Sequence, residues 1–279
     1  MKDLTRKQIP AQIVRDNLFM RIGVIGVGTI STNVIEAMQK LNTSHTFNLS
    51  PRSKQRAEDL TNKYKNCNQL NSNQEVVDQS DIIIISVLPK QVDEVLSELT
   101  FRADHLVASF IAGRPPSEIA KLTSPATKVA QLIPLPPIEL HKGPLLICPG
   151  IPELVETFAG LGDVIPFDDE QNIKVFSSAS AVMSTYFRLL IETVDWIAAQ
   201  GIDRTLATKY MTSLFEGLGA EANHIPPDLL TAMVREHETP GGLNESVRTN
   251  LEKADWYSAA STQLDYLLNV FIPALKNQK

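Results

Sequence analysis

The glycine-rich segment after the first apolar run constrains the fold of this chain most. Residues 22–25 read Ile-Gly-Val-Ile, and Gly26-Val27-Gly28 leads directly into residues 29–40, which have helical periodicity. A strand that turns through glycines into a helix is typical of a first βα unit, in which the N–H groups at the start of the helix face a phosphate. Ser31 is small enough to replace the third glycine of such turns. The segment therefore predicts a pyrophosphate site at Gly26, Gly28, Thr29, Ile30 and Ser31, with a glycine turn that binds nothing as the alternative.

Strand and helix patterns alternate up to residue 167 and then stop. The expected strands are residues 22–25, 46–50, 81–87, 105–112, 128–133, 144–148 and 163–167, and helical patterns lie between most of them, for example at 92–99, 116–122 and 151–160. This rhythm predicts an α/β Rossmann-like, doubly wound domain at residues 19–167, with its ligand at the carboxyl ends of the strands. From residue 168 to 279 the periodicity is helical, which predicts a second, all-α domain. Residues 1–18 form a charged extension.

The segment after the second expected strand indicates which dinucleotide is bound. An NAD site usually has an acidic residue there, whereas this chain has Ser50, Arg52 and Ser53, whose hydroxyl and guanidinium groups suit a 2′-phosphate. We therefore expect NADPH as the cofactor, with a solvated basic turn as the alternative. The later strand ends are expected to line the same cofactor, through Val87, Leu88, Pro89, Ala112 and Gly113.

Composition excludes several other classes of protein. The formal net charge of -6 argues against a nucleic-acid partner. The longest apolar run, residues 82–88, is far shorter than the roughly 20 residues that cross a bilayer, and the charged residues 1–20 lack the apolar core of a signal peptide. We therefore expect a cytoplasmic protein. The 2 cysteines and 5 histidines have no metal-ligand spacing, so no metal is expected.

The expected helical domain has more apolar surface than it can bury by itself. Helix patterns around residues 189–197 and 264–271 carry long apolar faces. Such faces favour a homodimer formed through the C-terminal helices. A self-contained helical bundle is the alternative.

From residue 21 onward, the order and spacing of several motifs resemble the pyrroline-5-carboxylate reductase family. The most specific of them is Thr239-Pro240-Gly241-Gly242, a turn that enters a long C-terminal helix in that family. The others are the glycine segment at 22–28, Val87-Leu88-Pro89-Lys90-Gln91, Ala112-Gly113, Ile133-Pro134-Leu135-Pro136-Pro137 and the small residues at 177–181.

The resemblance implies a dimeric reductase that transfers a hydride from NADPH to the C=N carbon of a cyclic imine, converting 1-pyrroline-5-carboxylate to proline. It implies that Asn244 and Thr239 act in catalysis, with the glycine N–H groups binding the substrate carboxylate. The implied substrate-binding residues are Pro240, Gly241, Gly242, Leu243, Asn244 and Ser178. His237 and Glu238 are titratable neighbours that can relay a proton, with exposed loop residues as the alternative.

Several positions depart from the family pattern. Leu243-Asn244 replaces a Thr-Thr or Ala-Thr pair, Leu135-Pro136-Pro137 replaces Asn-Thr-Pro, and Leu88 replaces a lysine. The stretch 178–182 replaces Ser-Gly-Ser-Gly-Pro. These changes indicate a divergent member, with either a different imine substrate or diminished activity.

Two other classes of protein stay open at this point. Coenzyme F420-dependent NADP reductases share a dinucleotide-binding domain followed by helices. β-Hydroxyacid dehydrogenases do so too, but residues 181–200 contain no lysine that can serve as their acid. The other class is a non-catalytic NADP-binding relative, which the lost polar positions favour and the retained Thr-Pro-Gly-Gly turn opposes.

Overall fold

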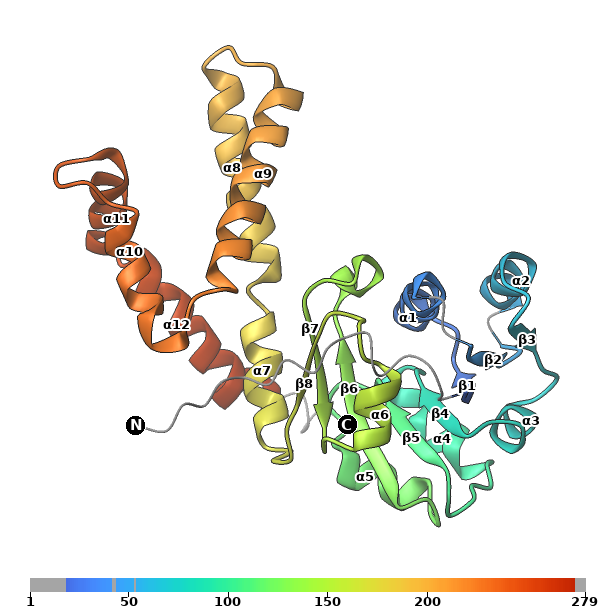
Figure 1. Cartoon of the computed structure of the whole chain (residues 1–279). Helices are drawn as coiled ribbons and strands as arrows, with labels where there is room; N and C mark the ends of the chain where they lie inside the picture. Colours follow the sequence, from blue (N-terminus) through green and yellow to red (C-terminus); the bar gives the residue numbers. More distant parts are fainter. Residues whose placement is uncertain (1–18, 42–43, 53, 274–279) are drawn as a thin grey trace. The chain divides into compact units, whose positions relative to one another are not determined.

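The computed structural model of the chain describes residues 19–41, 44–52 and 54–273 (Figure 1). The predicted extension at residues 1–18 and the candidate residue Ser53 lie outside these ranges. The chain divides into two compact units, the first ending at Ile173 and the second beginning at Lys174. Each unit is described by itself.

The first unit is built on an 8-stranded sheet of order β3-β2-β1-β4-β5-β6-β7-β8. Strands β1 to β6 are parallel, β7 runs antiparallel to β6, and β8 is parallel to β7. The strands are β1 (Arg21–Ile25), β2 (Thr46–Leu49), β3 (Cys67–Gln69), β4 (Ile82–Ile85), β5 (Leu106–Ser109), β6 (Lys128–Pro134), β7 (Pro144–Cys148) and β8 (Asp163–Pro166). The predicted doubly wound α/β fold is confirmed.

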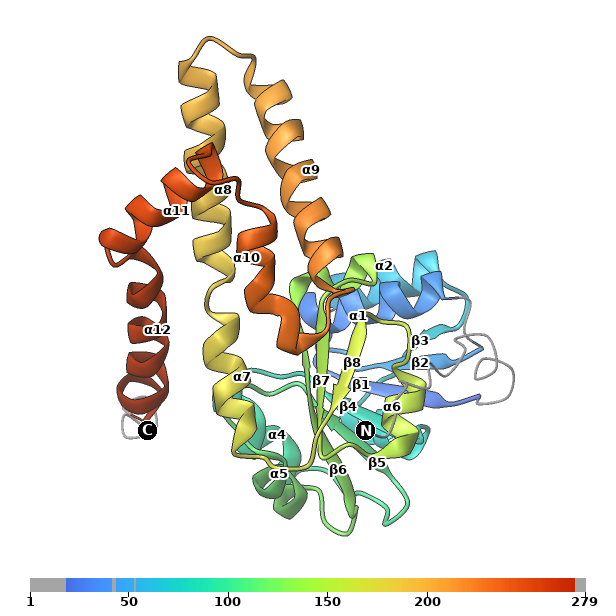
Figure 2. The ribbon, with the colours of Figure 1, turned by 60° about the vertical axis from the view of Figure 1, so that its left-hand side comes forward.

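Helices cover both faces of this sheet, as Figures 1 and 2 show. Strand β4 is buried on both sides, because Ile82 and Ile84 belong to one apolar core while Ile83 and Ile85 belong to the other. Helices α1 (Thr29–Lys40), α2 (Lys54–Lys63) and α6 (Pro152–Thr157) pack on the first core. Helices α3 (Asn73–Asp78), α4 (Val92–Ser97) and α5 (Pro116–Leu122) pack on the second. The period-2 alternation of a parallel strand thus supplies both cores.

Two elements of the first unit were not expected from the sequence. The strand β3 has only 3 residues, Cys-Asn-Gln, and pairs with β2 at one edge of the sheet. The short helix α3 follows it, capped by Ser72, whose Oγ accepts a hydrogen bond from the N–H of Glu75. Strand β3 completes the first βαβαβ half of the fold, and α3 connects it to β4.

Within the described residues, all regular secondary structure of the second unit is helical. The helices are α7 (Asn172–Ser180), whose first residues belong to the first unit, α8 (Met183–Ala199), α9 (Arg204–Ala222), α10 (Met233–Glu236), α11 (Leu243–Lys253) and α12 (Trp256–Tyr266). A 3-10 helix, Pro227–Ala232, precedes α10, and a π-helical stretch, Leu267–Phe271, follows α12. The helical periodicity of residues 245–276 predicts an almost continuous helix, interrupted at Pro273. This is wrong at Asp255, whose left-handed conformation (φ 55°) separates α11 from α12.

Few apolar side chains of the second unit are buried. Helices α8 and α9 pack side by side around Val194, Ala207 and Met211. Large side chains on the same two helices stay exposed, including Trp196 (67%) and Tyr210 (62%). An extensive apolar surface therefore has no partner within the described chain. None of the described helices combines the length and apolar character that crossing a bilayer requires.

Candidate functional site

The glycine turn after β1 has a backbone that only glycine fits. Gly26 has a φ of +93°, in the left-handed region. A β-carbon on Gly26 would lie 2.6 Å from the backbone oxygen of Ser86, which follows the neighbouring strand β4. Both the dihedral angle and the close approach of β4 therefore require glycine here.

Two serine hydroxyls hold this turn in place. Ser31 Oγ accepts a hydrogen bond from the N–H of Gly28 (2.9 Å) and donates to the oxygen of Gly26 (3.0 Å). Ser50 Oγ accepts from the N–H of Gly26 (3.0 Å), and Ser50 is only 1% exposed. The geometry therefore gives Ser50 a supporting role beneath the turn, and Arg52 is the described residue of this cluster that reaches solvent.

The start of α1 has the properties of an anion site. Gly28 is the N-cap, offers no side chain to the helix, and has open space where a β-carbon would point. The first turn of α1 contains no acidic residue, and Thr29 is exposed. The backbone N–H groups of Thr29 and Ile30 therefore lie at the positive end of the helix dipole, with no carboxylate in the first turn to compete for them. This arrangement fits a dinucleotide pyrophosphate.

The other predicted cofactor residues follow neighbouring strands at the same edge of the sheet. The parallel register pairs Ile25 with Ile85 and Ile85 with Ser109, so the ends of β1, β4 and β5 are level. Leu88 is 58% exposed just after β4. The register thus brings together, at one edge, the half-buried Val87 and Pro89 and the exposed Ala112 and Gly113.

The Thr-Pro-Gly-Gly turn of the second unit leads into α11, as the sequence predicts. Gly242 is the N-cap, and its N–H donates to the oxygen of Thr239 (2.7 Å). Gly241 has a φ of +73°. A β-carbon on Gly242 would lie 2.8 Å from that same Thr239 oxygen. The two glycines are therefore required by the tightness of the turn.

Side chains of the first turn of α11 reach back to the loop before it. Asn244 Nδ2 donates to the oxygen of His237 (2.7 Å). Glu245 Oε2 accepts from the N–H of Gly241 (2.6 Å). Leu243, the first helical residue, is 87% exposed. The glycine N–H groups that were expected to bind a substrate carboxylate thus both have partners within the chain.

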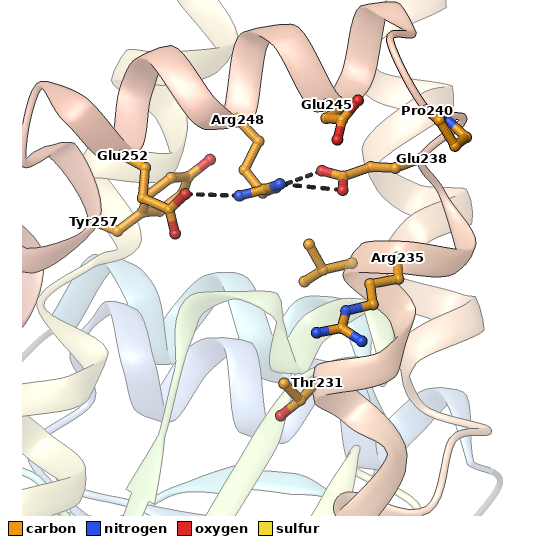
Figure 3. A pocket seen from close by; sticks show the side chains of 9 residues that line it. Thr231, Arg235, Glu238, Pro240, Glu245, Arg248, Glu252 and Tyr257 are labelled. Carbon is orange, nitrogen blue, oxygen red and sulfur yellow. Dashed lines mark hydrogen bonds and ion pairs between the residues drawn. The ribbon is translucent and has the colours of Figure 1, made fainter.

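A cavity of about 640 Å³ lies beside this turn, within the second unit (Figure 3). Arg248 crosses it and pairs with Glu238, through Nε–Oε1 and Nη2–Oε2 contacts, and with Glu252 (2.7 Å). Sequence reasoning missed Arg248, although its spacing of four residues from Glu252 is a helical ion-pair signal. The lining residues are Thr231, Val234, Arg235, Glu238, Pro240, Glu245, Arg248, Glu252 and Tyr257.

The two titratable neighbours of the turn have structural partners. His237 Nδ1 lies 2.9 Å from the oxygen of Met233, and Nε2 lies 3.2 Å from Glu221 Oε2. The hydrogen bond to Met233 and the charge of Glu221 raise the pKa of His237. Glu238 is held by Arg248. Both residues thus have partners within the second unit, His237 through hydrogen bonds and Glu238 through an ion pair.

The remaining candidates are easily placed. Ser178 lies on α7, and its buried Oγ has no hydrogen-bond partner in the described part of the chain. Cys67 and Cys148 are buried free thiols, and burial raises the pKa of each to about 11. Among residues 19–41, 44–52 and 54–273, no group of three His, Cys, Asp or Glu side chains is arranged to hold a metal ion.

Comparison with known proteins gives two kinds of match. The profile of the family described as "NADP oxidoreductase coenzyme F420-dependent" matches residues 21–113, the part that carries the glycine turn. A pyrroline-5-carboxylate reductase of Corynebacterium melassecola is 24% identical over 265 residues, which cover 88% of this chain and 96% of the relative.

Solved structures show the same fold. A 1-pyrroline-5-carboxylate reductase of Streptococcus pyogenes aligns with a TM-score of 0.76 and 17% identity, covering 90% of this chain and 97% of that one. A pyrroline carboxylate reductase of Plasmodium falciparum, solved with NADP bound, aligns with a TM-score of 0.75 and 17% identity, covering 89% and 95%. The chain is thus similar to pyrroline-5-carboxylate reductases along nearly its whole length in sequence, and it shares their fold.

Proposed function

We propose that this protein is an oxidoreductase that uses NADPH to reduce a cyclic imine carboxylate, with 1-pyrroline-5-carboxylate as substrate and proline as product. The observation that carries the proposal is the start of α1, where Gly28 leaves room for a phosphate and no acid competes for the helix N–H groups. The relatives that match nearly the whole chain carry the name of this reaction. NAD(P)H use follows from the same family, and the Plasmodium falciparum neighbour has NADP bound.

The roles of the residues follow from their chemistry. When bound, the nicotinamide supplies the hydride to the imine carbon. Thr29 and Ile30 would bind the pyrophosphate through their N–H groups. Arg52, which is exposed and has no ion pair among the described residues, would bind the 2′-phosphate. Because a protonated imine is already electrophilic, the main task of the protein is to hold its carbon near the hydride donor.

The substrate would lie at the turn that opens α11. The N–H groups of Leu243 and Asn244 begin this helix, and Gly242 offers no side chain to cap them. They can therefore bind a carboxylate, and the N–H of Gly241 becomes a third donor when Glu245 leaves it. The Asn244 amide would orient the imine, with Thr239, Pro240 and Ser178 as further contacts. We assign residues 19–167 to cofactor binding and 168–279 to substrate binding and dimerisation.

The exposed apolar surface of α8 and α9 supports a homodimer. Trp196 and Tyr210 lie there with more than half of their surface exposed, alongside Phe187 (59%) and Leu206 (60%). Burying such a surface against a second copy removes it from water. One chain has a mass of 30.8 kDa, and we expect sedimentation equilibrium to give twice this mass. A monomer at micromolar concentration would contradict this part of the proposal.

The experiment that tests the function follows NADPH oxidation and proline formation with 1-pyrroline-5-carboxylate. Arg52→Ala should lower kcat/KM for NADPH by roughly tenfold and leave that for NADH unchanged, because only NADPH carries the 2′-phosphate. Lys121→Ala removes a charge from α5 and serves as the control. No proline from the unmodified protein would refute the substrate, and an equal loss with both cofactors would refute the role of Arg52.

A coenzyme F420-dependent NADP oxidoreductase is the second candidate, favoured by the family profile that matches residues 21–113. That match is confined to the dinucleotide-binding part, which enzymes of both kinds need. Reduction of NADP by reduced F420, without turnover of any imine, would support this candidate. Tight NADPH binding with neither activity would support a non-catalytic relative.

A further inference from the structure

The turn before α11 carries a carboxylate of its own. Glu245 Oε2 lies 2.6 Å from the backbone nitrogen of Gly241 and accepts its hydrogen bond. Glu245 is the third residue of α11, so its side chain folds back toward the start of its own helix. A charged acceptor on a backbone N–H at this end of a helix forms a short, charge-assisted bond.

The start of α1 provides an internal comparison. Both helices begin after a glycine N-cap that follows a glycine with positive φ, Gly26 for α1 and Gly241 for α11. The first turn of α1 has no acidic residue, whereas that of α11 contains Glu245. One helix start is thus open to an external anion, while the other already holds an internal one.

Glu245 also lines the cavity beside the turn, so it has space to leave Gly241 (Figure 3). In that cavity Arg248 forms ion pairs with Glu238 and Glu252. Arg235 lines the same cavity and has no ion pair within the described residues. A released Glu245 carboxylate therefore stays in a cavity that contains a second guanidinium group.

We propose that Glu245 is a specificity-determining residue that competes with the substrate carboxylate for the N–H of Gly241. A carboxylated imine must displace Glu245 to reach this N–H group, and its negative charge is repelled while Glu245 stays. An imine without a carboxylate neither displaces Glu245 nor is repelled by it. Glu245 thus lowers the preference for carboxylated imines over uncarboxylated ones. This inference rests on the proposed function, because it assumes that the substrate binds at this turn.

The test compares Glu245→Gln with the unmodified protein on two imines, 1-pyrroline-5-carboxylate and 1-pyrroline. Glutamine keeps the size and an acceptor oxygen for Gly241 but removes the charge. We expect kcat/KM for the carboxylated imine to rise about tenfold, through KM, because a neutral hydrogen bond is roughly half as strong as a charge-assisted one. The value for 1-pyrroline should stay the same.

Glu252→Gln is the matched control, because Glu252 lies on the same helix and lines the same cavity but bonds Arg248 instead of the turn. It should leave the ratio of the two kcat/KM values unchanged. If Glu245→Gln lowers both values together, Glu245 is only a helix cap and the inference is overturned. The same conclusion follows if Glu252→Gln changes the ratio as much as Glu245→Gln does.

A binding measurement separates this inference from the proposed function. Titration of L-proline is followed at the Gly241 backbone amide by NMR in the unmodified protein and in Glu245→Gln. We expect Kd for L-proline to fall about tenfold in the variant, by the same weakening of the competing bond. If neither imine is reduced but Kd falls, the function fails and the competition stands. An unchanged Kd overturns the competition, whatever the activity.

Discussion

Replacing Gly26 by alanine should destabilise the first unit. The methyl group would lie 2.6 Å from the backbone oxygen of Ser86, and the φ of +93° is unfavourable for any residue with a β-carbon. Such a dihedral angle costs roughly 1–3 kcal/mol, and overpacking against backbone that cannot move away costs roughly 1–3 kcal/mol more. We therefore expect the free energy of unfolding to fall by about 2–6 kcal/mol.

Gly28→Ala is the matched comparison, because its added methyl group would point into open space at a φ of -95°. Its stability should fall by no more than about 1 kcal/mol, because alanine is a poorer N-cap than glycine. Its affinity for NADPH should fall as well, because the methyl group stands where the pyrophosphate approaches. Denaturant unfolding and calorimetric titration with NADPH measure the two quantities. A Gly26→Ala protein of normal stability, or a Gly28→Ala protein that binds NADPH normally, would refute this reasoning.

Further predictions concern side chains that bond to β1 and to the glycine turn after it. Ser50→Ala leaves the Gly26 N–H without its acceptor, so denaturant unfolding should show a loss of about 1–3 kcal/mol; unchanged stability would mean that the bond contributes nothing. The Arg21 side chain, through its hydrogen bonds, lowers the pKa of Asp81. Because the folded-state pKa is depressed, the stabilisation is present above the unfolded value of about 4 and is lost as pH falls through the folded value. Asp81→Asn should therefore flatten the acid limb of a stability–pH curve, and an unaltered slope would contradict the pairing.

The sequence was sufficient for the elements whose pattern is local. The glycine turn and the apolar periodicity of α1 predict its bounds, and the β-branched run of β4 predicts burial on both faces. The strand β3 was missed because it has only 3 residues and little apolar character. Its stability comes from pairing with β2. The N-cap signal of Ser72 and Glu75 was available and could have placed α3.

The candidate site was only partly predictable, for a physical reason. A sequence pattern places a side chain at the end of a strand or helix but does not give the direction in which it bonds. Ser50 turns inward to Gly26, and Asn244 turns back to His237. The left-handed backbone of Asp255, which divides the expected C-terminal helix, has no glycine to signal it.

The central claim is that this chain transfers a hydride from NADPH to the carbon of a cyclic C=N bond. The most direct measurement supplies NADPH carrying deuterium at the transferable nicotinamide C4 position, together with 1-pyrroline-5-carboxylate, and examines the product by mass spectrometry and NMR. The account predicts proline that carries the deuterium at the ring carbon formerly in the C=N bond. An absence of proline, or proline without the deuterium, would contradict it.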